Sequence, residues 1–139
     1  LKQNLSRHSS GETILYVLEP IRVNWDADDS RSGEFQALDY FITNITKISS
    51  KNVRIRIRPH PSDTVDKYRY WVNQQSIKIE ISKVNSLAED IYWSDIVIGC
   101  QSYALVVALA AQKRVFSSLP PLAPVLVLPY PGIQQLRAI

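Results

Sequence analysis

The sequence predicts an α/β fold in which helices cover both faces of a doubly wound parallel sheet, making a three-layer sandwich. The first observation behind this prediction is a regular alternation of strand and helix patterns, in the order β-α-β-α-β-α-β-α-β. The second is that residues 13–18 and 95–100 are predominantly apolar, as strands are when a parallel sheet buries both of their faces. The third is the length of 139 residues, which suits one domain with its own core.

The first strand and helix follow from the opening third of the chain. Residues 13–20, TILYVLEP, are a short apolar run that Pro20 closes, and an acidic loop follows it. In residues 34–49 the apolar side chains recur at steps of three and four, which puts them on one face of a helix. These residues are Phe35, Leu38, Phe41, Ile42, Ile45 and Ile48.

The next two strands carry a different pattern, in which apolar and polar residues alternate strictly. Residues 53–58 alternate isoleucine or valine with arginine, and residues 77–82 alternate isoleucine with polar residues. Such alternation predicts one wet face on each strand, as near the edge of a sheet. Glu80 is expected to pair with an arginine across the ladder. A helix over residues 63–75 joins the two strands, with Val65, Tyr68 and Trp71 or Val72 inward.

The second half of the chain shows helix signals and apolar strands. Ser86 and Glu89 have the spacing of a capping box, which predicts a helix that starts after Ser86. The apolar strand 95–100 comes next, then an almost wholly apolar helix in SYALVVALAAQK and a final strand in RVFSSLP. The last residues, 121–139, are rich in proline in their first half and predict no regular element before GIQQLRAI.

Polarity predicts the order of the strands. The two apolar strands belong in the middle and the two alternating ones stack outward on one side, which gives a Rossmann-like sheet of order 3-2-1-4-5. We therefore expect a disordered stretch at 1–12, a Rossmann-like domain at 13–120 and a proline-rich tail at 121–139. Because the chain begins with Leu and contains no Met, we expect it to be a piece of a longer protein.

Composition narrows the classes of function. Hydrophobic residues make up 45% and charged residues 21% of the chain, as in ordinary globular proteins. No apolar run approaches the ~20 residues of a membrane span, and the first residues are not a signal peptide, so we expect a cytoplasmic location. The net charge is only +3, but residues 47–69 carry seven bases against two acids. This local cationic region suits a small anionic ligand better than nucleic acid.

Metal chemistry is not expected from these residues. Cys100 is the single cysteine and lies in an apolar run, which predicts a buried thiol. With His8 in a Ser-rich stretch, one cysteine and one ordered histidine cannot build a zinc cluster. Asp26 and Asp28 form an Asp-x-Asp triplet, but it lies in a polar loop rather than at the end of a strand, so a solvated loop is favoured over a divalent-cation site. We expect no metal and no cofactor.

Three segments should meet at one edge of this sheet. In open α/β sheets the ligand crevice forms beyond the carboxyl ends of the strands, where the strand order reverses. Glu19 and Pro20 follow the first strand. His60, Pro61 and Ser62 follow the second. The fourth strand ends in the run Gly99, Cys100, Gln101, Ser102 and Tyr103.

These segments offer groups that bind anions. The fourth strand turns into a helix through Gly99, so the first amides of that helix are free to bind an anion, with Gln101 and Ser102 as further donors. Ser102 equally suits a helix cap. His60 lies between two prolines that restrict its backbone, and Arg58 has the same face parity as His60 and would complement an anion. The alternative for His60 is a packed residue at a strand end.

The motifs at these positions resemble a known family. RIRPHPSD, followed by LAEDIYWSDIVIGCQSYALVVALAAQKRVFSSLP, is similar to the carboxyl-terminal, donor-binding half of GT-B glycosyltransferases of the bacterial sialyltransferase and polysialyltransferase type. In that family the His of a His-Pro motif contacts the phosphate of a CMP-sugar, and a Ser-Ser motif at a helix start also binds the nucleotide. His60-Pro61 matches the first motif. Gln101-Ser102 matches the second in part, and Gln112 stands where such domains usually have Gly.

The resemblance, which covers residues 13–120, implies a role and a missing partner. The parent protein would be a glycosyltransferase for surface polysaccharide, with CMP-sialic acid as the expected donor and His60 as the catalytic residue that stabilises the leaving phosphate. Arg58, His60, Pro61, Ser62, Glu19, Gly99, Gln101, Ser102 and Tyr103 would bind the nucleotide. The general base would lie in an amino-terminal acceptor-binding domain outside this sequence, so the fragment alone would bind donor without turnover. The resemblance also allows peripheral membrane association of the parent.

Two other functions remain open at this stage. The first is a donor domain for CDP-glycerol or CDP-ribitol, because polyol-phosphate transferases resemble this layout and also use a cytosine nucleotide. The second is a non-enzymatic Rossmann-like domain that binds a partner. A receiver domain would need an Asp at the end of the third strand, where Ser82 and Lys83 stand instead. Trp25, Trp93 and Tyr130 are expected to be packing residues.

Overall fold

A computed structural model describes residues 11–139 of the chain. Residues 1–10, most of the stretch expected to be disordered, lie outside the described part, whereas Gly11 and Glu12 belong to the first strand. The strands are β1 (Gly11–Val17), β2 (Asn52–Arg58), β3 (Ile79–Ile81), β4 (Ile96–Gly99), β5 (Arg114–Ser117) and β6 (Ile133–Gln135). The helices are α2 (Gly33–Thr43), α3 (Ile45–Ile48), α4 (Asp66–Gln74), α5 (Leu87–Trp93), α6 (Ala104–Ala110) and the 3-10 helix η1 (Leu136–Ala138).

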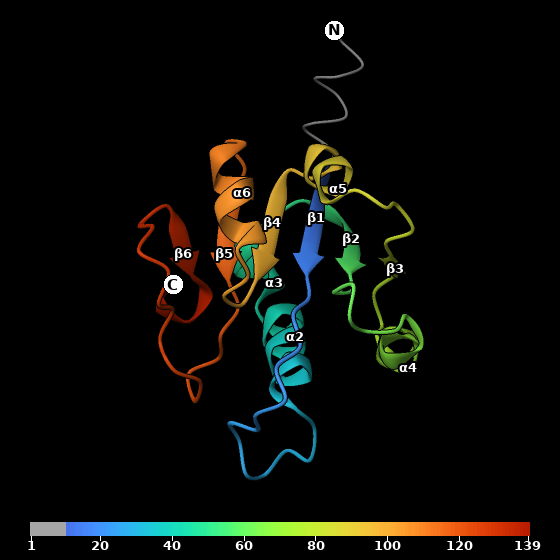
Figure 1. Cartoon of the computed structure of the whole chain (residues 1–139), viewed down its shortest axis with the longest axis vertical. Coiled ribbons are helices and arrows are strands. Elements are labelled where there is room, and N and C mark those ends of the chain that lie inside the picture. The colour runs from blue at the N-terminus through green and yellow to red at the C-terminus, as the bar shows by residue number, and fades with distance from the viewer. Residues whose placement is uncertain (1–10) are drawn as a thin grey trace, which may run out of the picture.

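The strands form one parallel sheet in the order β3-β2-β1-β4-β5-β6, which confirms the predicted α/β fold (Figure 1). The predicted order 3-2-1-4-5 is present, and β6 extends it by one strand. This strand comes from the segment set apart as a tail and pairs in parallel with β5 from Val115↔Ile133 to Ser117↔Gln135. Strand order reverses between β1 and β4, which both lie in the middle.

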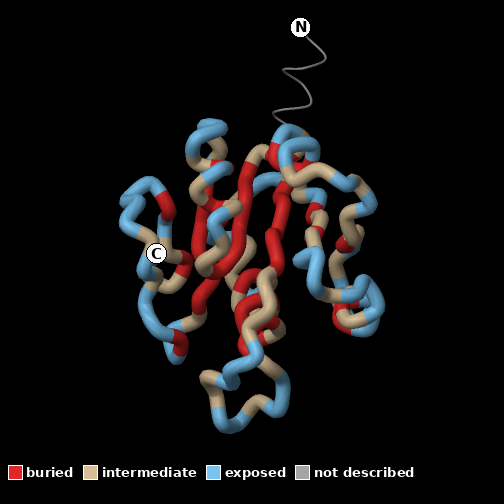
Figure 2. The backbone as a smooth tube through the Cα atoms, viewed as in Figure 1, coloured by how far each residue is buried: buried red, intermediate tan, exposed pale blue. Residues whose placement is uncertain are grey.

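Helices cover both faces of the sheet, as expected for a three-layer sandwich. On one face α2, α3 and α4 pack against alternate strand residues, with Leu38, Phe41, Tyr68 and Trp71 in the core. On the other face α5 and α6 pack through Ile91, Leu105 and Ala108, and residues 126–128 of the last crossover add two leucines. The central strand β4 is buried along its length and β1 from Ile14 to Val17, whereas much of the loop at the lower edge is exposed (Figure 2).

The helix expected over residues 34–49 is broken at Asn44 into α2 and α3. The Asn44 side-chain amide donates to the carbonyl of Tyr40 at 2.8 Å, and the Asn44 backbone N–H shares the same carbonyl at 3.2 Å. Asparagine competes with the helix backbone in this way, so the interruption has a local cause. The apolar face continues across the break, because Phe41 and Ile48 enter the same core.

The expectation of a wet face on the second strand is correct at Arg54, whose side chain is 69% exposed, and wrong at the two arginines that follow. Arg56 and Arg58 lie beneath α5, and their side chains are only 16% and 17% exposed. The carboxylate of Asp90, which is fully buried, accepts a hydrogen bond of 2.9 Å from each guanidinium. The predicted pairing of Glu80 across the ladder is confirmed, with Arg54 at 3.3 Å and Arg56 at 3.6 Å. A buried acid therefore allows these two arginines of β2 to pack beneath a helix.

Candidate functional site

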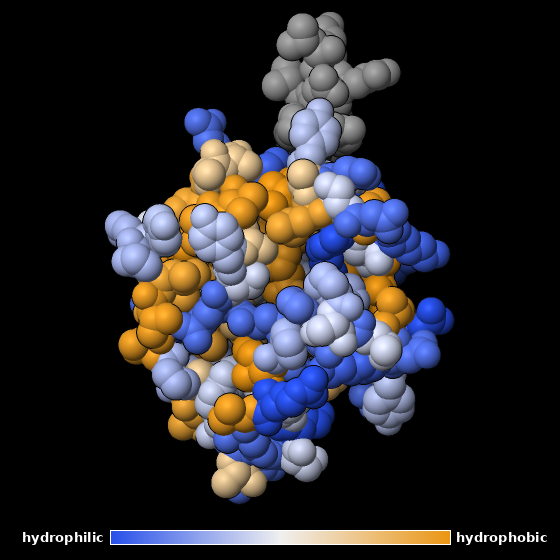
Figure 3. All heavy atoms as spheres, in the orientation of Figure 1, coloured by the Kyte–Doolittle hydropathy of each residue, from blue (hydrophilic) through white to orange (hydrophobic). Residues whose placement is uncertain are grey.

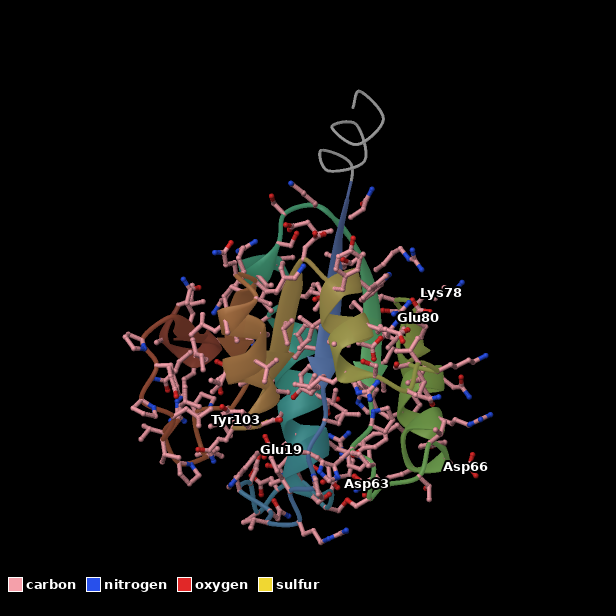
Figure 4. The ribbon with its side chains drawn as sticks, turned by 45° about the horizontal axis from the view of Figure 1, so that its top comes forward. Glu19, Asp63, Asp66, Lys78, Glu80 and Tyr103 are labelled. Carbon is pink, nitrogen blue, oxygen red and sulfur yellow. The ribbon has the colours of Figure 1, made fainter. Side chains whose placement is uncertain are left out.

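The loops after β1, β2 and β4 meet at the carboxyl edge of the sheet, as predicted for parallel strands. Figure 4 shows Tyr103, Glu19 and Asp63 in this order along that edge, with Lys78 and Glu80 toward the other end of the strands. The three labelled residues come from the α6 entry, the β1–α2 loop and the β2–α4 loop. The structure thus gathers the segments that the sequence analysis singled out.

Glu19 and Gln101 are joined by a hydrogen bond at the place where the strand order reverses. Glu19 Oε1 accepts a hydrogen bond of 2.6 Å from the Gln101 amide, so the carboxylate of the β1 loop takes a donor that we expected to face an anion. Ser102 Oγ accepts a hydrogen bond of 3.1 Å from the Ala104 amide, which stabilises the turn before α6, but the N-cap residue of that helix is Tyr103. The helix that follows, α6, has only seven residues.

Gly99 and Gln101 have structural roles in this turn. A Cβ at Gly99 would lie 2.8 Å from Val17 Cγ2 and 3.0 Å from the Val17 carbonyl, so glycine allows β4 to approach the end of β1. Gln101 Oε1 accepts a hydrogen bond of 3.1 Å from the amide of Val127, which ties the β5–β6 crossover to the turn. Tyr103, by contrast, is 69% exposed beside them.

His60 lies in a tight turn at the tip of β2. The Asp63 amide donates to the His60 carbonyl at 2.9 Å, and the Ser62 amide donates to His60 Nδ1 at 3.1 Å. Ser62 Oγ is also 2.8 Å from the same nitrogen. Because the Ser62 amide N–H donates to it, Nδ1 acts as an acceptor in this turn, which leaves Nε2 as the ring nitrogen that can donate to a ligand. The His60 side chain is exposed rather than packed, so Nε2 is available to a ligand.

Arg58 is engaged within the fold rather than open to the edge. Besides Asp90, its guanidinium donates to the carbonyls of Val84 at 2.9 Å and Asn85 at 3.0 Å. Ser82 Oγ is a further donor to Asp90, at 2.5 Å. The arginine therefore fixes the β3–α5 connection, and its role as an anion ligand, which stays a prediction, would require these bonds to open.

A buried polar cluster lies behind the turn of β4. The hydroxyls of Tyr16 and Ser118 are 2.7 Å apart, and Cys100 Sγ is 3.8 Å from the Tyr16 hydroxyl. Burial raises the pKa of Cys100 to about 12, and the nearby Glu19 carboxylate adds to this shift. Burial also raises the pKa of Tyr16 well above its usual value. The prediction of a buried thiol is confirmed.

The acidic β1–α2 loop is stabilised by hydrogen bonds and an ion pair between its own residues. The amide of Asp28 donates to Asp26 Oδ1 at 2.9 Å, and Asn24 Nδ2 donates to the Asp29 carbonyl at 2.6 Å. Arg31 pairs with Asp29 at 2.9 Å and lowers the pKa of that carboxyl. Within residues 11–139, no group of three or more His, Cys, Asp or Glu side chains has the geometry to hold a metal ion. None of the helices of that part is long and apolar enough to cross a membrane.

One cluster at this edge was not foreseen in the sequence. Lys67 Nζ lies 2.8 Å from Glu34 Oε1 and 3.2 Å from Asp63 Oδ1, and both carboxylates are almost fully buried. Tyr68 donates to Asp63 Oδ2 at 3.2 Å. The spacing of Asp63 and Lys67, four residues apart, is the one sequence signal that could have indicated part of it. Glu34 comes from a distant segment of the chain, so only the tertiary structure shows that it belongs to the cluster.

The chain has no significant match among models of known protein families, curated proteins or solved structures.

Proposed function

We propose that this domain binds the cytidine nucleotide of a CMP-sugar and is the donor half of a GT-B glycosyltransferase for surface polysaccharide, with CMP-sialic acid as the expected donor. The observation that carries the proposal is the exposed turn at His60. In this turn the Ser62 amide donates a hydrogen bond to Nδ1, which leaves Nε2 to bind a ligand. The turn lies at the carboxyl edge of the sheet, on a loop next to the one that carries Glu19.

His60 would act on the phosphate of the nucleotide. In the parent transferase, departure of CMP increases the negative charge on this phosphate, and a donor held in place before the reaction stabilises that charge without reorganising. The hydrogen bond from the Ser62 amide fixes the orientation of the ring. His60 is thus the proposed catalytic residue, and Ser62 positions it.

Glu19 would bind hydroxyl groups rather than phosphate. Its carboxylate already accepts the hydrogen bond of the Gln101 backbone N–H, and its negative charge would repel a phosphate placed beside it. A carboxylate is an acceptor only and therefore pairs with hydroxyl donors such as those of a ribose. This arrangement favours a nucleotide whose sugar lies near β1 and β4 and whose phosphate lies toward β2.

The acceptor and the general base would come from an amino-terminal domain across the cleft, so the present chain would bind donor without turnover. Several large apolar side chains of the β5–β6 crossover are exposed, which fits a surface that another domain covers. They are Leu122, Val125 and Val127. In Figure 3 hydrophobic atoms gather over the left side of the view, where α6 and this crossover lie.

The test is a titration of the ¹⁵N-labelled domain with CMP, CDP and UMP, followed by amide chemical shifts. CMP should shift the amides of His60, Ser62 and Gln101 first, and His60→Gln should weaken CMP binding by roughly tenfold, the loss expected for one hydrogen bond to a charged group. Asp66→Asn, on the exposed face of α4, is the matched control and should bind as the wild type does.

Each outcome of this titration has a distinct meaning. Absence of shifts with every nucleotide would remove the proposal and leave a partner-binding domain. Equal binding by His60→Gln and the wild type would remove the role of the imidazole. In a second titration with the two complete donors, tighter binding of CDP-glycerol than of CMP-sialic acid would replace the sugar donor with a polyol-phosphate donor.

A further inference from the structure

Lys67 connects two loops that lie side by side at the carboxyl edge of the sheet. On one side it pairs with Asp63, whose amide closes the His60 turn. On the other side it pairs with Glu34, at the start of α2. Glu34 Oε2 in turn accepts a hydrogen bond of 2.5 Å from the amide of Ile21, two residues after Glu19.

The burial of these groups makes the two ion pairs of Lys67 costly to break. The side chains of Glu34 and Asp63 are 2% and 5% exposed, and that of Lys67 is 22% exposed. Two carboxylates this close in a buried place repel each other, and a single ammonium compensates both. Further donors complete their shells, from Ser32 to Glu34 at 2.8 Å and from Tyr68 to Asp63 at 3.2 Å.

We propose that Lys67 is a positioning residue that couples the His60 turn to the β1–α2 loop. Displacement of the His60 turn would break the Lys67–Asp63 ion pair, and displacement of the β1–α2 loop would break the hydrogen bond from the Ile21 amide to Glu34, the other partner of Lys67. The two loops therefore hold their ligand-facing residues in a fixed relation. The coupling itself is a property of the free domain, whereas its effect on nucleotide affinity rests on the proposed function.

A purely stabilising role predicts a different behaviour. If the cluster only added stability, the loss of Lys67 would raise the opening rate of the whole domain uniformly. If it couples the loops, its loss frees two specific amides, those of Ile21 and Asp63, and leaves the amides of β1 and β4 protected. Amide hydrogen exchange in the ligand-free protein separates these cases.

The experiment compares hydrogen exchange in the wild type, Lys67→Met and Arg69→Met. Arg69 is the matched control, because it forms an exposed pair with Asp66 on the same helix. In Lys67→Met we expect the amides of Ile21 and Asp63 to exchange roughly tenfold faster, within the range of coupling between packed elements. If this single variant does not fold, the double variant Glu34→Gln/Lys67→Met replaces it. The double variant removes the charge of Glu34 together with that of Lys67, so only one buried carboxylate is left without its cation.

In that double variant the side-chain carbonyl introduced at position 34 can still accept the Ile21 hydrogen bond, so Ile21 should stay protected while the Asp63 amide exchanges faster. A uniform increase over all amides in Lys67→Met, or faster exchange at Asp63 with no change at Ile21, would overturn the coupling. The affinity measurement comes second. A wild type that does not bind CMP refutes the proposed function and leaves the exchange result valid, whereas a Lys67→Met variant that binds CMP as the wild type does refutes the positioning role.

Discussion

Glu19 Oε1 accepts a hydrogen bond of 2.6 Å from the amide N–H of Gln101, a residue 82 positions later in the chain. The bond joins the ends of β1 and β4, the two strands between which the sheet reverses its order. A carboxylate thus stands at the place where open α/β sheets form their ligand crevice. Under the proposed function, this place would therefore take hydroxyl donors rather than a phosphate.

Glu19→Gln tests this role. The amide oxygen of the variant can still accept from Gln101, so the turn should keep its shape, but hydroxyl donors lose a charged acceptor. We expect CMP binding to weaken by roughly tenfold and the preference for CMP over its 2′,3′-dideoxy analogue to disappear. Isothermal titration calorimetry measures both. If the wild type does not discriminate between the two nucleotides, Glu19 does not contact the ribose.

Asp90→Asn tests the buried network under α5. The substitution keeps the volume but leaves the guanidinium groups of Arg56 and Arg58 without their shared carboxylate. Breaking one partner of a buried ion pair costs about 3 kcal/mol or more, so the free energy of unfolding from urea titrations should fall by about that amount. Asp66→Asn removes only an exposed pair and should leave the midpoint unchanged. Equal midpoints for both variants would contradict this account.

Gln112→Gly tests the end of α6. Gln112 has a φ of 64°, the left-handed conformation that favours glycine, and it is the one non-glycine residue with positive φ within residues 11–139. Glycine there removes the steric cost, so we expect a gain of about 0.5–1 kcal/mol in the free energy of unfolding. Ala111→Gly is the control, because φ there is −82° and glycine only adds freedom to the unfolded chain. The two changes should move the urea midpoint in opposite directions.

The thiol of Cys100 should resist alkylation in the folded protein. Its pKa is raised to about 12, so at pH 8 the reactive thiolate is nearly absent, and the side chain is buried as well. Iodoacetamide at pH 8 should leave the native protein unlabelled and label the urea-unfolded protein fully, as mass spectrometry would show. Complete labelling under native conditions within minutes would indicate a thiol that is open to solvent.

Local patterns predicted most elements but not all of their limits. The predicted helix start after Ser86 was correct, because the Ser86 side chain accepts a hydrogen bond from the Glu89 amide at the start of α5. The third strand was expected over residues 77–82, and only Ile79–Ile81 pair with β2. Strand length depends on the partner strand, so alternation in one segment overestimates it. The prolines in residues 121–131 gave no sign that a strand follows them. The sequence could not indicate β6, because its parallel pairing with β5 is a non-local interaction.

The candidate site shows the same division. His60, Ser62, Glu19 and Gln101 could be assigned to one edge from sequence, since the carboxyl ends of parallel strands must meet there. The engagement of Arg58 with Asp90, and of the Gln101 amide with Glu19, could not be foreseen. Both contacts join residues far apart in the chain, and their partners carry no periodic signal.

By itself, the sequence determined the alternation of strands and helices, the central place of the apolar strands and the loops that share an edge, because these follow from hydrophobic periodicity and from the geometry of parallel sheets. Only the tertiary structure decided which polar groups are already satisfied inside the protein. Glu34, Lys67 and Asp63 come together from two helices and one loop, and burial turns three ordinary charged residues into one connected unit. Pairing of buried charges depends on distances that no local pattern records.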